Sequence, residues 1–175
     1  MPPIEPPPPL EDEGPGAMPF ASAVVIPGSP RAISDELVRC AADALAFYLA
    51  AKVAHWNVKG HEFACLHALF EKVGDQAREA ADDLAERAVA LGARVDLVLA
   101  STAEAARLPG YPSGLSDGAD HAGALAAMNN QFLGHARALR EEATRQGDDG
   151  TFDLVNGIAR AFEKAAWMLH ATLEG

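Results

Sequence analysis

Four long stretches of the chain carry apolar residues at the three- and four-residue spacing of an amphipathic helix. In the last of them, Phe162, Ala165 and Leu169 fall on one side of a helix. A glycine follows each of the first three stretches, as is typical of a helix C-terminus. The predicted helices cover about residues 35–58, 63–91, 117–146 and, from the run GDDGTFD at 147–153 onward, up to 173.

One connection, between the second and third helices, is longer than the others. It holds a shorter helical pattern over 95–106 and then the turn-rich run LPGYPSGLSDG. Ser116 or Asp117 offers an N-cap for the third helix, as Ser34 or Asp35 does for the first. Four long helices with one extended connection predict an all-α fold, a ferritin-like four-helix bundle with a short extra helix between helices two and three.

The first 33 residues differ in composition from the rest. They contain ten of the twelve prolines and open with PPIEPPPPL. Because proline removes the hydrogen bonds of helix and sheet, residues 1–33 are expected to form a disordered arm. Within it, the apolar piece 21–26 has two interpretations, a segment packed on the bundle or on a partner and a loosely draped tail, and the second is favoured. A single domain is predicted for residues 34–175.

The chain carries 25 acidic against 14 basic residues, a formal net charge of −11. Such a surface attracts cations and argues against a dedicated nucleic-acid binder. No apolar run reaches the roughly 20 residues that span a bilayer, and the N-terminus lacks the basic and apolar regions of a secretory signal. Cys40 and Cys65, without CxxC spacing, fit a reducing compartment and are expected in the core. These features predict a cytoplasmic protein.

Residue types that bind transition metals concentrate in the second predicted helix. His67 and Glu71 are four residues apart and share one helix face. Asp82 and Glu86 have the same spacing. The eleven-residue step from Glu71 to Asp82 makes about three full turns plus 20°, so the two pairs lie on nearly the same side of the helix. Along the axis that step is roughly 16 Å, whereas metal–ligand bonds are about 2 Å long. One ion therefore cannot contact both pairs on one helix. A second copy of this helix, antiparallel about a twofold axis near Gln76, would bring Glu71 of one chain next to Asp82 and Glu86 of the other. The spacing predicts a metal site between subunits.

His55 lies in the last turn of the first predicted helix. A histidine there commonly caps the C-terminus, but the ligand types in the second helix favour a metal role. Trp56 beside it is expected to be buried and to shield the site. For the carboxylates the alternative is a solvated face paired with nearby arginines. Asp83 points some 100° away from Asp82 and is a weaker candidate.

The run K-x-x-HWNVKG-x-x-F-x-x-LH-x-x-FE, followed by D-x-x-x-ER-x-x-x-LG, resembles the signature of the Dps mini-ferritins. It extends from Lys52 to Gly92, and a weaker likeness continues through YPSGLSDGADHAGAL, so that the resemblance covers about residues 34–175. It implies a hollow dodecamer built from twofold dimers. Such a cage binds Fe²⁺, oxidises it with H₂O₂ or O₂ and stores ferric mineral, which makes the protein a ferroxidase whose metal is iron.

The resemblance also implies which residues bind the iron. One subunit supplies His55, His67 and Glu71 as ligands. Its partner supplies Asp82 and Glu86. In the resembled family the tryptophan at the position of Trp56 lies close to the iron site and is thought to intercept oxidising species. Many relatives place Asp where this chain has Glu71, but both are hard oxygen ligands.

The acidic run at the start of the fourth helix has two interpretations. Acidic residues at a helix N-terminus are ordinary caps. In the resembled family the corresponding segment lines threefold pores that admit Fe²⁺, and the residues implied here are Asp148, Asp149 and Asp153. Gly150 stands where some relatives carry another Asp, which makes the funnel less charged.

Two rival functions remain open. A nucleoid-packing protein would protect DNA physically, but many relatives bind DNA through a Lys-rich arm and this arm is acidic. A four-helix di-iron oxidase acting on an organic substrate would need an access cleft and would not form a twelve-subunit cage. Standard ferritins build a site inside one bundle from Glu-x-x-His motifs, and none occurs in this chain, which favours the site between subunits.

Overall fold

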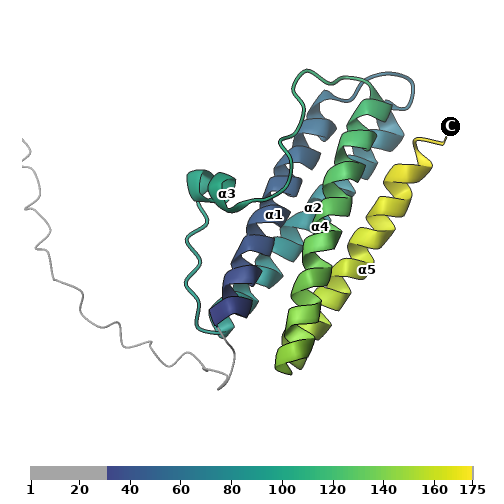
Figure 1. Ribbon diagram of the computed structural model, residues 1–175. Coiled ribbons are helices and arrows are strands. Elements are labelled where there is room, and N and C mark those ends of the chain that lie inside the picture. Colours follow the sequence, from purple (N-terminus) through teal and green to yellow (C-terminus); the bar gives the residue numbers. More distant parts are fainter. Residues whose placement is uncertain (1–30, 175) are drawn as a thin grey trace, which may run out of the picture.

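A computed structural model describes residues 31–174 as five helices (Figure 1). Their bounds are α1 Arg31–Asn57, α2 Phe63–Ala90, α3 Leu99–Ala105, α4 Gly118–Gln146 and α5 Asp149–Ala171. One antiparallel hairpin consists of α1 and α2 and the other of α4 and α5, while α3 packs against α1 in the long connection. The predicted all-α bundle with a short extra helix is confirmed. Most of the proline-rich arm, including the piece 21–26, lies outside the described residues.

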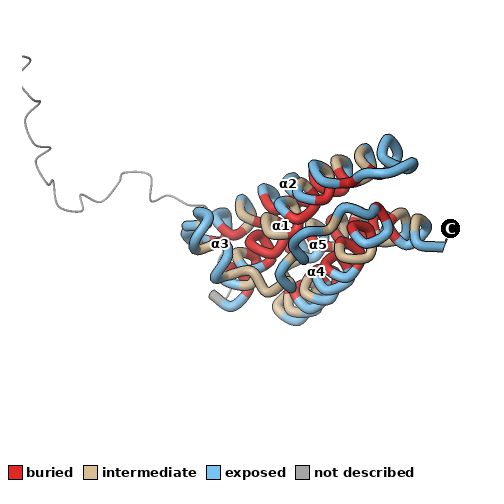
Figure 2. Tube along the Cα trace, turned by 90° about the horizontal axis from the view of Figure 1, so that it is seen from above, coloured by how far each residue is buried: buried red, intermediate tan, exposed pale blue. Residues whose placement is uncertain are grey.

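The core is formed by the inward faces of the four long helices, where the buried stretches of the trace lie between the helices (Figure 2). Each long helix contributes one fully buried phenylalanine. They are Phe47, Phe70, Phe132 and Phe162. The rings of Phe132 and Phe162 stack with centroids 4.2 Å apart, and Phe47 lies 5.7 Å from Phe162. Truncating one such ring in a packed core costs about 3–5 kcal/mol. Within the described residues, no helix is long and apolar enough to span a bilayer.

Several predicted helix ends are wrong by a few residues. The first helix begins at Arg31, so the caps proposed at Ser34 and Asp35 lie inside it. The fully buried Ile33 explains the extra turn, because it extends the packed face beyond the predicted start. The short helix is Leu99–Ala105 rather than 95–106. The cap at Asp117 is confirmed, since its side chain accepts a hydrogen bond from the Ala119 amide.

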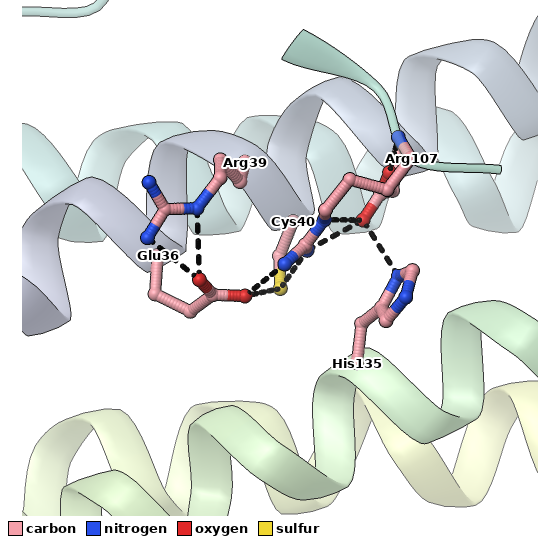
Figure 3. A network of polar contacts seen from close by, with 6 residues as sticks. Glu36, Arg39, Cys40, Arg107 and His135 are labelled. Atoms are coloured by element: carbon pink, nitrogen blue, oxygen red, sulfur yellow. Dashed lines mark hydrogen bonds and ion pairs between the residues drawn. The ribbon is translucent and has the colours of Figure 1, made fainter.

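A buried polar network ties the long connection to the bundle (Figure 3). Asp43 of α1 is fully buried and accepts hydrogen bonds from the Arg107 backbone amide and guanidinium, both at 2.6 Å. His135 of α4 donates from Nδ1 to the same carboxylate at 3.0 Å. The guanidinium also reaches Glu36 and lies 3.5 Å from the Cys40 sulfur. One arginine therefore fixes the segment that follows α3 against α1 and α4.

Two burial predictions are wrong in the single chain. Cys40 is buried as predicted, and burial raises the pKa of its thiol to about 12. Cys65, in contrast, is exposed in the first turn of α2. Trp56 was expected to be buried but is 66% exposed, because the last turn of α1 points that side chain away from the bundle. Both residues lie at the end of the α1–α2 hairpin that carries the candidate ligands.

Candidate metal centre

The two candidate histidines lie next to each other at the α1–α2 turn. His55 is in the last turn of α1 and His67 in the second turn of α2, and the intervening turn reverses the chain at Gly60, where φ is +102°. Their rings stack with centroids 3.6 Å apart. The two histidines thus come from different helices but form one half-buried cluster.

Reciprocal hydrogen bonds fix the orientation of both rings. Nδ1 of His55 lies 2.9 Å from the His67 carbonyl oxygen, and Nδ1 of His67 lies 2.9 Å from the His55 carbonyl oxygen. A carbonyl oxygen only accepts, so each Nδ1 carries the proton. In a neutral ring the lone pair is then on Nε2, which is the arrangement that metal-binding histidines adopt.

Glu71 completes the cluster one turn beyond His67. Its Oε2 lies 3.1 Å from His55 Nδ1 and is paired with Lys52 Nζ. The hydrogen bond from Lys52, together with the nearby histidines, holds the pKa of the Glu71 carboxyl below its ordinary value of 4.5. Lys52 also lies 5.9 Å from the Trp56 ring centroid. A cation that binds Glu71 must share this carboxylate with the Lys52 ammonium group or displace it.

Lys52 is a site residue that the sequence analysis missed. Its position three residues before His55 was visible in the sequence, since the resembled motif begins there. A lysine on a helix, however, is most often a solvated side chain. Only the fold shows that it crosses from α1 to α2, where its side chain is 15% exposed.

Asp82 and Glu86 lie farther along α2 and are both exposed. Among the described residues, no three His, Cys, Asp or Glu side chains lie close enough together to hold a metal ion within one chain. Asp82 borders a groove of about 330 Å³ whose walls come from α1, α2 and the connection. Its lining is Leu45, Arg78, Ala81, Asp82, Ala85, Val95 and Leu97. Whether a second copy brings these carboxylates to His55 and His67 stays a prediction.

An apolar surface adjoins this groove on the α1 and α3 side. It consists of Leu49, Val53, Val98 and Leu99. Leu99 is 81% exposed and Val98 69%, although both are large apolar residues. Exposed apolar patches of this kind mark surfaces that another protein covers.

The three acidic residues at the start of α5 are in different environments. Asp148 caps the helix, accepting from the Thr151 amide at 3.0 Å, and pairs with Arg87 of α2 at 2.5 Å. Burial raises the pKa of Asp148, but the Thr151 hydrogen bonds and the Arg87 charge outweigh it and leave the pKa below its ordinary value. Asp149 and Asp153 are exposed. The capping interpretation therefore describes Asp148, while pore lining stays a prediction for all three.

The Arg87–Asp148 contact explains why residue 150 is a glycine. A Cβ atom added there would lie 2.9 Å from an Arg87 guanidinium nitrogen. The absent side chain leaves room for Arg87 to reach Asp148. Arg87, one of the arginines near the α2 carboxylates, bridges to Asp148 of α5 instead.

The chain folds into two helical hairpins and carries histidine and carboxylate side chains on α1 and α2. This combination is typical of ferritin-like proteins. Residues 34–175 match the ferritin-like domain family. The DNA protection during starvation protein of Brevibacillus brevis is 33% identical over 123 residues, which are 69% of this chain and 80% of that protein. This chain belongs to the Dps family of ferritin-like proteins.

Solved structures agree with that assignment. The Dps protein of Vibrio cholerae O1, described as a member of a broad superfamily of ferritin-like diiron-carboxylate proteins, is 32% identical with a TM-score of 0.77. The match covers 81% of this chain and 89% of that one. Antigen TpF1 of Treponema pallidum is 26% identical with a TM-score of 0.79, covering 91% and 98% of the two chains.

Proposed function

We propose that this protein is a Dps-type ferroxidase that binds Fe²⁺ between two copies of the chain, oxidises it with H₂O₂ or O₂ and stores the ferric product inside a dodecamer. The observation that carries the proposal is the pair His55 and His67, whose Nδ1 atoms are both held by carbonyl oxygens. Two imidazole nitrogens prepared in this way at the end of an acidic helix suit a first-row transition metal.

Each ligand has a distinct task in this reaction. The two histidines supply imidazole nitrogen donors. Glu71 supplies a carboxylate, and the hydrogen bond from Lys52 holds the pKa of this group below its ordinary value. Asp82 and Glu86 of the second copy would add two further carboxylates. The growing negative charge stabilises Fe³⁺ over Fe²⁺, which favours loss of an electron. Two Fe²⁺ ions give two electrons to H₂O₂, whose O–O bond breaks to leave two hydroxide ions.

A cytoplasmic location and twofold assembly belong to the same proposal. The exposed Leu49, Val53, Val98 and Leu99 lie beside the Asp82 groove, so a second copy that covers this surface also approaches the carboxylates. A DNA-packing role is left out, because the net charge of −11 repels phosphate and the N-terminal arm is acidic.

Single-ligand variants test the proposal. His67→Ala and Asp82→Ala should each slow peroxide-driven Fe²⁺ oxidation, followed by ferric absorbance, by at least about tenfold, as expected when a ligand or its support is lost. Asp83→Ala is the matched control, because Asp83 is an equally exposed carboxylate that points away from the stripe. Particle mass is measured for each variant to show that assembly is intact. Oxidation at the wild-type rate in both ligand variants would reject the site.

A further inference from the structure

Tyr111 and His121 form a hydrogen-bonded pair outside the candidate metal centre. The Tyr111 hydroxyl lies 2.5 Å from His121 Nδ1, and the two rings are nearly parallel. Tyr111 belongs to the connection after α3, whereas His121 lies in the first turn of α4. His121 is fully buried and Tyr111 is half-buried. The iron chemistry proposed above uses neither residue.

The environment keeps both members of the pair neutral. Burial lowers the pKa of His121 and raises that of Tyr111 to about 12. The phenol therefore donates its proton to Nδ1, and the histidine carries its own proton on Nε2. Within the described part of the chain this buried Nε2 makes no close hydrogen bond, although a contact of the ring with the Leu115 backbone favours its protonated form.

The pair lies close behind the candidate ligands. Phe70, which directly precedes Glu71 on α2, meets His121 edge to face with ring centroids 6.1 Å apart. Phe70 is fully buried, and at this separation the edge of one ring contacts the face of the other. Leu66, the neighbour of His67, packs against α4 at Gly118. The candidate metal centre and the Tyr111–His121 pair are thus joined through one layer of packed side chains.

We propose that Tyr111 and His121 act as an internal trap for one-electron oxidants, in which Tyr111 gives up an electron and His121 takes the phenol proton. The oxidant is hydroxyl radical, formed when one Fe²⁺ reduces H₂O₂ by a single electron. It takes an electron from Tyr111 and becomes hydroxide, the O–H bond of Tyr111 breaks, and the proton moves to His121 Nδ1. The products are a neutral tyrosyl radical and an imidazolium. This inference rests on the proposed iron chemistry.

The structure favours this proton transfer in two ways. An oxidised phenol is a strong acid that must lose its proton, and His121 Nδ1 is already at hydrogen-bond distance. The imidazolium that forms is stabilised by the charges of Asp117 and Asp120, which act on His121 from the start of α4. The Tyr111 ring is half-buried, so the radical is less accessible to other molecules than one on Trp56, which is 66% exposed.

The chain provides its own control, since Tyr48 is the only other tyrosine. The assembled protein is loaded with Fe²⁺, mixed with H₂O₂ and freeze-quenched for electron paramagnetic resonance, while ferric absorbance is followed in parallel. Ring-deuterated tyrosine distinguishes a tyrosyl signal from a tryptophanyl one. We expect the wild type and Tyr48→Phe to give a tyrosyl signal and Tyr111→Phe to lose it. All three should oxidise iron at the same rate. His121→Gln, which accepts a hydrogen bond but not a proton, should lower the signal.

Failure of the trap can be told apart from failure of the proposed function. Iron oxidation without a tyrosyl signal, or a signal that survives in Tyr111→Phe, would overturn the inference and leave the ferroxidase proposal standing. If iron is not oxidised, the iron-free protein is oxidised by flash photolysis of a ruthenium tris-bipyridine complex with persulfate. A radical that depends on Tyr111 and His121 in that experiment supports the pair, and its absence rejects it.

Discussion

Lys52 gives the candidate site a positive charge where the proposed reaction needs to bind a cation. Its ammonium group pairs with Glu71, and the same carboxylate oxygen lies 3.1 Å from His55 Nδ1. The lysine thus keeps Glu71 ionised and in place, but it also repels an incoming metal ion. These two effects oppose each other, and a substitution of Lys52 separates them.

Lys52→Met should bind divalent metal more tightly than the wild type. Removing a unit charge a few ångströms from a cation at a partly exposed site is worth about 1–2 kcal/mol, or roughly tenfold in affinity. Titration with Co²⁺, which resists oxidation under these conditions, measures the change. Lys72→Met, which alters an exposed lysine on α2, is the control. Weaker binding by Lys52→Met would mean that the lysine organises the site more than it repels the metal.

At the scale of elements, the Asp43–Arg107 contact holds the long connection in place. Arg107→Met removes the guanidinium and leaves the fully buried Asp43 with only the backbone amide of residue 107 and His135 as partners. Losing one member of a buried ion pair costs about 3–5 kcal/mol, because the remaining charge stays buried. Denaturant unfolding at a fixed protomer concentration should show a loss of this size. Arg94→Met, which removes an exposed arginine from the same connection, should change stability by less than about 0.5 kcal/mol. Equal effects of the two substitutions would contradict this role.

The start of α5 should be sensitive to acid. The pKa of Asp148 is lowered from its ordinary 3.8, so its contribution to stability is complete above that pH and is lost as the pH falls through the lowered value. Asp148→Asn should therefore destabilise the protein by about 1–3 kcal/mol at neutral pH. The difference from wild type should shrink below about pH 4. The matched control is Asp149→Asn, an exposed neighbour. A difference that is constant with pH would show that the charge of Asp148 is not what matters.

The helices could be predicted from the sequence because their signals are local. Apolar spacing, an acidic cap at Asp117 and the left-handed Gly147 each act within a few residues. The Asp43–Arg107 pair could not be predicted, since its members are 64 residues apart and neither belongs to a periodic pattern. The start of α1 was missed for a related reason, because the burial of Ile33 depends on neighbours from other helices.

The candidate site also has features that local sequence predicts and features that depend on the fold. The stripe that carries His67, Glu71, Asp82 and Glu86 follows from helix geometry alone. The stacked histidine rings and their reciprocal carbonyl contacts follow from the α1–α2 turn, which periodicity does not describe. Trp56 was predicted to be buried but is exposed in one chain, so its surroundings are decided by what covers this surface.

At the scale of the whole molecule, the central claim is that one chain holds only half of the iron site. Two halves come together if a second copy packs on the surface formed by α1, α2 and the connection. Such an isologous contact makes two identical sites per dimer, each with ligands from both copies. In such a shared site, two chains with different defects can together form one intact site, which a site within one chain does not allow.

Mixed assemblies of two slowed variants measure that consequence directly. In a dimer of one His67→Ala chain and one Asp82→Ala chain, one site carries both defects and the other carries none. Random mixing in equal amounts should therefore restore about one quarter of the wild-type sites, read as Fe²⁺ oxidation per particle. Each variant alone should keep no more than about a tenth of the wild-type rate. Recovery near one quarter is the predicted result, and no recovery from well-mixed assemblies of wild-type mass would contradict a site shared between chains.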